Sequence, residues 1–480
     1  MVYIMRLNEK IFSYILLILI IAVNIWLSVS NALFLEHEEV SRFPHAKGYV
    51  SDEVWYVNAA RNILRNIFNS IPNIDKPKAT LIYTSNEDLQ RAKSLASLYN
   101  INIIYESFTK INAIYVESKD YNNIKVFANK TNAIDVIYGW ILADSGDINK
   151  YMNFEHPPTA KYLIALTMLF EDRPFFWRVP SIIMGVIVTL MTYFITYTIS
   201  KSREISLIAT AFVAVDPMTR FLSSIAILDI YIAAFTLIAI YLALKDRLKE
   251  ATLVLGIAST FKFTALIAFV PLLFLYIKYV MRQTTRFLDV LSASIEYLFL
   301  VILSFTFFQI LFSLPIIIKI GLSNWFTESI LKALSWHLTI KCVGTDCPVA
   351  STPWDWFFGL NSFPLYVDSH GKVMYAAGFI PAYTISFILM FLTLPYRKYN
   401  TISRDAWYIP FGLFLGYCIL WLAGSRTQYS FYAIQLTAPI YIFLVIQLYE
   451  YLSRDKITLT LNAWKAILTY LWNALTAIFR

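Results

Sequence analysis

Apolar residues run along this chain in long, nearly uninterrupted blocks. Most blocks are close to the ~20 residues that a helix needs to cross a ~30 Å hydrocarbon core. Because lipid-exposed backbone must satisfy its own hydrogen bonds, we expect these blocks to be helices. The predicted spans lie near residues 11–30, 178–199, 205–220, 222–244, 252–264, 265–280, 288–312, 376–395, 406–424 and 429–450. The last segment, 457–480, is either a span or a helix at the membrane surface.

Composition agrees with this pattern, since the chain is 58% hydrophobic and only 15% charged. The sequence therefore predicts an all-α polytopic membrane protein with about 10–11 transmembrane helices. The formal net charge of +8 is spread over short loops rather than gathered on a soluble domain, which argues against nucleic-acid binding. The first apolar run follows Arg6 and Lys10 and has no A-x-A-like cleavage site after it, which is typical of an uncleaved signal anchor.

Cations between the predicted spans indicate the orientation. Lys201 and Arg203, for example, lie in a short loop of the kind that stays in the cytoplasm. We therefore expect a multi-pass protein of the cell membrane with a cytoplasmic N-terminus. The apolar run 251–280 is too long for one span and has cations at both ends. A hairpin of two short helices with Lys262 near its outer tip fits this pattern, and one strongly tilted helix is the alternative.

This topology divides the chain into regions that alternate between the membrane and the outer face. The regions are a first span (1–30), an outward segment (31–177), a set of spans (178–312), a second outward segment (313–375) and C-terminal spans (376–480). In the first outward segment, ATLIYT, INIIYE and NAIYVES alternate with a helical stretch, which predicts a small inserted α/β unit over 75–130. The second carries Cys342 and Cys347, spaced for a disulfide in an oxidising exterior, with two free thiols as the alternative.

Two adjacent acids, Asp52 and Glu53, follow the first span on the predicted outer side. Neighbouring side chains do not share one face of a helix, so at most one of them points into a site. One carboxylate would then serve as a general base, and the other would bind a ligand, a metal ion or a nearby cation. Alternatively, both acids begin the helix WYVNAARNIL, where an N-cap and first-turn acids are favourable.

Ionisable residues also crowd the approach to the span that begins near residue 178. Glu155, His156, Lys161 and Arg178 fall within one segment next to apolar sequence. A membrane protein keeps such a density of ionisable groups beside lipid where it binds or catalyses. The segment is therefore a candidate site.

Further ionisable residues are predicted at or near the same outer boundary: Arg220, Lys262 and Arg426. Each cation could alternatively snorkel to the interface without a functional role. Asp229 is placed about two turns inside a span, where a charge costs ~3 kcal/mol. We expect Asp229 to pair with Arg220 or Lys262, because an unpaired charge there would be costly.

These motifs resemble those of protein O-mannosyltransferases, integral membrane enzymes of the C-type glycosyltransferase fold. In that family an Asp-Glu pair, an HPPLGK-like motif and an R-x-PS segment follow one another. Here they are Asp52-Glu53, EHPPTAK (155–161) and RVPS (178–181). Later stretches, GIASTFKFTAL and the segment ending STPWDW, resemble family elements in the same order. The short 313–375 segment and the inserted unit depart from eukaryotic members and suggest an archaeal or bacterial-style relative.

The resemblance implies a glycosyltransferase that moves mannose or a related hexose from dolichyl or another polyprenyl phosphate to Ser or Thr hydroxyls of exported proteins. Asp52 would be the base, and Glu53 or Glu155 would bind the sugar or a divalent ion such as Mg²⁺ or Mn²⁺. His156 would shape the Pro-Pro turn. Cations would clamp the departing phosphate: Lys161, Arg178, Arg220, Lys262 and Arg426.

Two other functions stay open. The same fold could transfer a lipid-linked sugar to a glycolipid or glycan, as aminoarabinose transferases do to lipid A. A transporter or lipid flippase is the alternative from another class. Transporters tend to show internal repeats and polar sites near the bilayer midplane, whereas the ionisable residues here gather at one boundary. This distribution favours an enzyme whose catalytic loops lie on the extracellular side.

Overall fold

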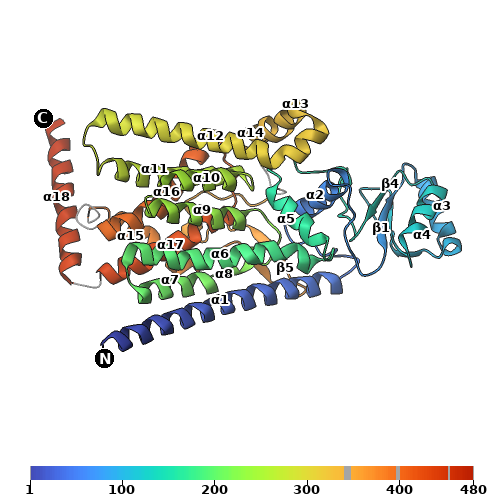
Figure 1. Ribbon diagram of the computed structural model, residues 1–480, viewed down its shortest axis with the longest axis horizontal. Coiled ribbons are helices and arrows are strands. Elements are labelled where there is room, and N and C mark those ends of the chain that lie inside the picture. The colour runs from blue at the N-terminus through green and yellow to red at the C-terminus, as the bar shows by residue number, and fades with distance from the viewer. Residues whose placement is uncertain (1, 340–346, 396–400, 452–453, 479–480) are drawn as a thin grey trace.

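The computed structural model shows a helical bundle with a small sheet beyond one end (Figure 1). The structure describes residues 2–339, 347–395, 401–451 and 454–478. Within these ranges, six helices are long and apolar enough to cross a membrane. They are Lys10–Ser41, Pro174–Ser200, Phe263–Val280, Phe287–Ile320, Ile402–Leu422 and Ser430–Tyr451. The predicted class, a polytopic helical membrane protein with a small α/β unit, is confirmed.

The bundle is built from helices that run largely along its length (Figure 1). They are α1 (Val2–Ser41), α6 (Pro174–Ser200), α7 (Arg203–Val215), α8 (Pro217–Leu222), α9 (Asp229–Leu244), α10 (Leu248–Ser259), η2 (Phe263–Ala268) with α11 (Phe269–Val280), α12 (Phe287–Ile320), α15 (Ile380–Leu392), α16 (Thr401–Leu422) and η6 (Ser430–Ala433) with α17 (Ile434–Tyr451). Helix α17 lies in the middle of the bundle, and 94% of its most apolar stretch is buried by the surrounding protein. Both α1 and α12 extend past the predicted limits of residues 30 and 312.

The predicted span near 205–220 is broken in the structure. Helix α7 ends at Val215, and α8 begins at Pro217 after a residue with extended backbone, Asp216. The Asp216 carboxylate accepts a hydrogen bond of 3.0 Å from the backbone N–H of Thr219 and so caps α8. Proline at the first helical position favours this restart. The next long helix therefore begins only at Asp229, not at the predicted residue 222.

The run 251–280 forms two helices that meet at Lys262, in agreement with the predicted hairpin. Helix α10 ends at Ser259, and η2 begins directly after Lys262. At the opposite ends, Arg282 and Asp246 form an ion pair of 3.2 Å, which brings the chain before α10 next to the chain after α11. The two helices are therefore antiparallel, and the alternative of one tilted helix is wrong.

The last helix, α18 (Arg454–Ile478), runs across the end of the bundle instead of along it (Figure 1). The indole N–H of Trp464 donates to the carbonyl of Leu392 at 2.8 Å and attaches α18 to this end. Its apolar side chains include Leu468 and Trp472, which are 60% and 68% exposed. An amphipathic helix in this position fits the surface-helix alternative for 457–480.

The inserted unit is a four-stranded antiparallel sheet in the order β2-β3-β1-β4. Its elements are β1 (Lys78–Ile82), α3 (Asn86–Leu95), β2 (Asn102–Tyr105), β3 (Ala113–Glu117), α4 (Tyr121–Lys130) and β4 (Asp135–Tyr138), a split βαβ arrangement. Leu81, Ile114 and Phe127 belong to its hydrophobic core. On β3, the buried Tyr115 donates a hydrogen bond of 3.3 Å to the carbonyl of Gly139. Strand β4 pairs with β1 and therefore belongs to the unit, so the unit extends past the predicted limit of residue 130.

Two short helices, α2 (Glu53–Asn66) and α5 (Thr159–Met168), lie between the bundle and this sheet (Figure 1). The segment 313–375, which the sequence predicts to face outward, contains α13 (Leu322–Trp325), a π-helical turn (Phe326–Leu331) and α14 (Lys332–Thr339). It continues with a short turn (Asp355–Phe357) and the hairpin β5 (Pro364–Val367) and β6 (Val373–Tyr375). These pieces and the ends of the bundle helices surround the candidate site.

Candidate active site

A cavity of about 440 Å³ lies at the end of the bundle that carries α2. Its walls come from five separate parts of the chain, so only the fold assembles it. The lining residues are Asp52, Trp55, Tyr56, Tyr151, Asn153, Glu155, His156, Lys262, Pro348, Tyr429, Phe431 and Tyr432.

Asp52 is the residue before α2, and its side chain lines the cavity instead of capping the helix. No residue that the structure describes donates a hydrogen bond to its carboxylate. Burial raises the pKa of Asp52 to about 6; the charge of Lys262 opposes this shift, and that of Asp229 adds to it. A free carboxylate with a pKa close to neutral is well suited to accept a proton from an incoming hydroxyl.

Glu53 points away from the cavity into the protein interior. Its carboxylate accepts hydrogen bonds of 2.8 Å from both Nε and Nη2 of Arg178. The backbone N–H groups of Val50 and Ala226 donate to it at 2.8 and 2.7 Å. Consecutive residues of a helix point about 100° apart, so only one acid of the pair faces the cavity. The expectation that Glu53 binds sugar or metal, and that Arg178 clamps phosphate, does not fit this geometry.

Lys262, at the tip of the hairpin, presents a buried ammonium to the cavity. It lies 2.8 and 3.0 Å from the two carboxylate oxygens of Asp229. The same ammonium lies 4.2 Å from the ring centre of Tyr432 and 5.3 Å from that of Phe431. Asp229 thus pairs with Lys262, while Arg220 is exposed at the end of α8.

The loop before α5 carries Glu155 into the cavity. The hydroxyl of Tyr151 and the side-chain amide of Asn153 both donate to Oε1 of Glu155, the latter at 3.0 Å. Asn153 has a positive φ of 51°, a conformation that asparagine tolerates better than most residues. The loop therefore places one hydrogen-bonded carboxylate opposite Asp52.

Lys161 supports this loop through hydrogen bonds and does not line the cavity. Its ammonium donates to the carbonyls of Met152 and Asn153, and to that of His156 at 2.7 Å. Burial lowers the pKa of Lys161 to about 7, and the charge of Glu155 opposes this shift. The ring of His156 meets that of Tyr56 edge-on at 5.8 Å. The geometry makes Lys161 a support of the loop, unlike the predicted phosphate clamp.

Arg426 does not line the cavity either. Its guanidinium lies 3.6 Å from the ring centre of Trp421 and is exposed. Of the five cations predicted to clamp phosphate, Lys262 is therefore the one that the described cavity contains.

Cys347 is disulfide-bonded, and Pro348 beside it lines the cavity. The predicted partner, Cys342, lies outside the described residues. Among the residues that are described, no group of three or more His, Cys, Asp or Glu side chains could hold a metal ion. Glu155 is the only one of the two predicted metal ligands that reaches the cavity. Asp52 and Glu155 are the two carboxylates that the described residues bring into the cavity.

The sequence analysis did not predict several of the residues that line the cavity: Tyr151, Asn153, Tyr429, Phe431 and Tyr432. A signal was available for the last three. They form an aromatic run at the start of an apolar span, directly after Arg426 and Gln428. Aromatic faces beside polar groups are suited to sugar rings as well as to cations.

Part of the chain matches a known protein family. Residues 155–312 match the family described as dolichyl-phosphate-mannose-protein mannosyltransferase. No curated protein matches the chain.

Solved structures give more distant similarities. ArnT from Cupriavidus metallidurans bound to undecaprenyl phosphate is 13% identical over 65% of this chain and 53% of that chain, with a TM-score of 0.39. The apo oligosaccharyltransferase of Archaeoglobus fulgidus is 11% identical over 95% and 54%, with a TM-score of 0.45. AglB from the same organism, in complex with an inhibitory peptide and a dolichol-phosphate, is 12% identical over 94% and 54%, with a TM-score of 0.41.

The chain spans about half the length of the solved structures that it matches. The family match instead covers a continuous stretch that includes the EHPPTAK motif and Arg178, and that contributes Glu155, His156 and Lys262 to the cavity. Over residues 155–312 the chain is thus recognised as similar to the dolichyl-phosphate-mannose-protein mannosyltransferases, and the resemblance predicted from its motifs is confirmed.

Proposed function

We propose that this protein is a membrane glycosyltransferase that moves a hexose from a polyprenyl phosphate to a hydroxyl acceptor. The observation that carries the proposal is the free carboxylate of Asp52 in a cavity that also contains the ammonium of Lys262. One group suits the proton of the acceptor, and the other suits the charge of the leaving phosphate. The family match over residues 155–312 supports the same class of reaction.

In the proposed reaction, Asp52 accepts the proton of the acceptor hydroxyl as its oxygen attacks C1 of the sugar. The bond between C1 and the phosphate oxygen breaks, and polyprenyl phosphate leaves with the electron pair. Lys262 faces the negative charge that develops on that phosphate. Because there is one displacement, the configuration at C1 inverts.

The remaining walls of the cavity suit a sugar. Trp55, Tyr56 and Tyr429 offer aromatic surface, and Glu155 offers acceptor oxygens for sugar hydroxyls. Burial and the charge of Asp52 raise the pKa of Tyr56, so its phenol stays protonated and can donate.

A separate apolar cavity of about 490 Å³ suits a polyprenyl chain. It lies between α12 and α13, with Phe305, Ile310 and Trp325 in its walls. Gln309, which also lines it, donates to the carbonyl of Ser259 at 2.8 Å. Ser259 is the last residue of α10, directly before the turn that carries Lys262. This proximity would place the lipid tail beside the phosphate.

We infer that the sugar is mannose or a related hexose, that the acceptor is a Ser or Thr hydroxyl of an exported protein, and that the cavity faces outward. A glycolipid or glycan acceptor is the second candidate within this class. A transporter is disfavoured because the cavity lies at one end of the bundle rather than at its middle.

The test is transfer by the purified protein of radiolabelled mannose from dolichyl-phosphate mannose to a Ser/Thr-rich peptide, beside the Asp52→Asn variant. Label in the peptide with the wild type alone supports donor, acceptor and base together. Release of free mannose that depends on Asp52, without labelled peptide, would keep the donor and reject the protein acceptor. If the wild type neither labels the peptide nor releases free mannose, the result would argue against dolichyl-phosphate mannose as the donor.

A further inference from the structure

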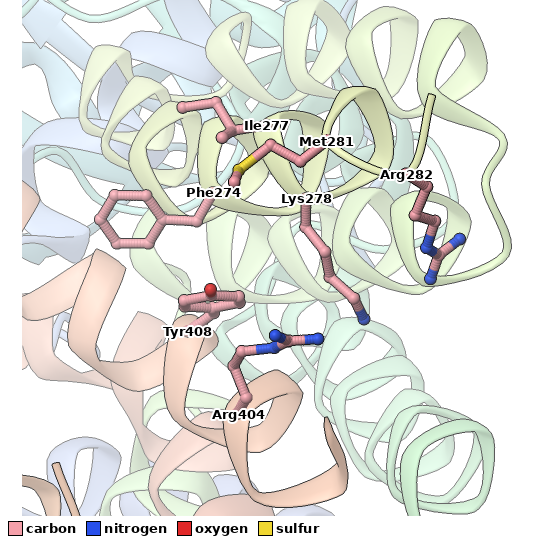
Figure 2. Close-up of a pocket in the computed structure, with 7 residues that line it drawn as sticks. All are labelled: Phe274, Ile277, Lys278, Met281, Arg282, Arg404 and Tyr408. Carbon is pink, nitrogen blue, oxygen red and sulfur yellow. The ribbon is translucent and has the colours of Figure 1, made fainter. Parts of the chain in front are cut away.

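A second polar cavity, of about 390 Å³, lies between α11 and α16 at the end of the bundle opposite the candidate active site. Helix α11 follows η2 from Lys262 and ends near this cavity, while α16 begins at it and ends toward Tyr429. We call it the α11–α16 pocket. Its lining residues are Phe274, Ile277, Lys278, Met281, Arg282, Arg404 and Tyr408 (Figure 2).

The pocket contains more positive than negative charge. Lys278 lies 2.5 Å from both carboxylate oxygens of Asp405, and Arg282 pairs with Asp246 at 3.2 Å. Arg404 forms no ion pair among the described residues, and its buried Nε has no hydrogen-bond acceptor. Three cations therefore face two carboxylates, and Arg404 is the unmatched charge.

Arg404 and Lys278 extend from facing helices toward the same space (Figure 2). Lys278 already has Asp405 as its counter-charge, so Arg404 is the cation of this pair that lacks one. A guanidinium without a counter-charge in a half-buried pocket indicates an anionic ligand. A phosphate group fits best, because a guanidinium donates to two phosphate oxygens at once and an ammonium adds a point charge.

The other walls indicate a lipid source for this phosphate. Phe274, Ile277 and Met281 form an apolar side, and Met281 is 58% exposed. A soluble anion would gain nothing from this apolar side, whereas the glycerol and acyl groups of a phospholipid would cover it. Basic pockets between helices at a membrane surface bind anionic headgroups in this way.

We propose that the α11–α16 pocket binds the phosphate of an anionic phospholipid, with Arg404 as its main donor. The site lies away from the proposed sugar transfer and involves none of its residues. Bound lipid would bridge α11 and α16, and would thereby stabilise the bundle at the end opposite the active site.

The test uses the full chain, stripped of lipid in a non-ionic detergent, and follows the thermal midpoint during titration with short-chain phosphatidylglycerol. Phosphatidylcholine of the same chain length and inorganic phosphate are titrated in parallel. The matched variant is Arg404→Gln. A second variant, Arg404→Lys, retains the positive charge but lacks the paired N–H donors of the guanidinium. Arg247→Gln is the control, because Arg247 lies at the same end, pairs with Glu250 at 3.0 Å and does not line the pocket.

Phosphatidylglycerol should raise the midpoint of the wild type and of Arg247→Gln. The apparent affinity should fall at least about tenfold in Arg404→Gln and less in Arg404→Lys. The midpoint of Arg404→Gln without lipid shows whether it folds. Equal affinity of wild type and Arg404→Gln would overturn the proposal, and so would equal shifts by phosphatidylcholine. A shift by inorganic phosphate as large as that by phosphatidylglycerol would overturn the lipid source.

Discussion

Glu53 and Arg178 form a fully buried ion pair of 2.8 Å that joins the start of α2 to α6. Asp52, the neighbour of Glu53 in the chain, lines the cavity on the other side. The two acids therefore have different surroundings: Glu53 holds α2 against the bundle, and Asp52 is the proposed general base. Substitution of each acid by its amide separates these two roles.

Glu53→Gln should lower the stability of the protein by roughly 3–5 kcal/mol, because it leaves a buried guanidinium without its counter-charge. The measurement is the thermal midpoint in detergent. Asp52→Asn is the control and should not lower the midpoint, since burial disfavours the charge that this substitution removes. A stable Glu53→Gln variant without activity would instead indicate that Glu53 acts on the substrate.

The rate of sugar transfer should rise with pH through about 6, because Asp52 accepts a proton only in its ionised form and its pKa is raised to about 6. The measurement is kcat/KM across this range. The sign of the stability effect is opposite. The pKa of Asp52 is higher in the folded than in the unfolded protein, so its contribution to stability falls as pH rises from its usual pKa to about 6. A rate independent of pH near 6 would contradict the role of Asp52.

Lys262→Met should reduce transfer by at least about 100-fold, because the leaving phosphate loses its cation. The variant should also be less stable, because Asp229 keeps a buried charge without a partner. The double variant Lys262→Met/Asp229→Asn should recover stability but not transfer. Recovery of transfer in the double variant would show that Lys262 serves only to neutralise Asp229.

Lys161→Met should weaken substrate binding, because three carbonyls of the loop that carries Glu155 and His156 lose their donor. KM should rise by roughly tenfold, while the pH midpoint near 6 stays, since Lys161 does not act through Asp52. The measurement is KM and kcat across pH for the wild type, Lys161→Met and Lys161→Arg. A shifted pH midpoint would instead place Lys161 in the proton transfer.

After reduction of the disulfide, a membrane-impermeant maleimide should label Cys347 from the outer side of intact cells. Pro348 beside it lines the cavity, so this side is the proposed catalytic side. A single-cysteine variant that retains Cys347 makes the assignment unambiguous. Label that enters only from the cytoplasmic side would invert the proposed orientation.

Some of these features could be predicted without coordinates because they depend on neighbouring residues alone. The length of each apolar block predicts a membrane helix, and the helix angle between Asp52 and Glu53 predicts that only one faces a site. The hairpin around Lys262 followed from cations at both ends of an apolar run. Other boundaries depended on local chemistry that hydrophobicity hides, such as Asp216 and Pro217, which end one helix and begin the next.

The sequence by itself determined the class of protein, the family resemblance and the candidate residues, because composition and motif order are properties of the chain. Only the tertiary structure decided which candidates meet. Arg178 and Lys161 are cations near the predicted boundary, as Lys262 is, but their acceptors lie elsewhere in the fold. A side chain's role depends on which partner packs against it, and those partners come from distant parts of the sequence. For this reason, Lys262 faces the cavity, while Arg178 holds Glu53 in the interior.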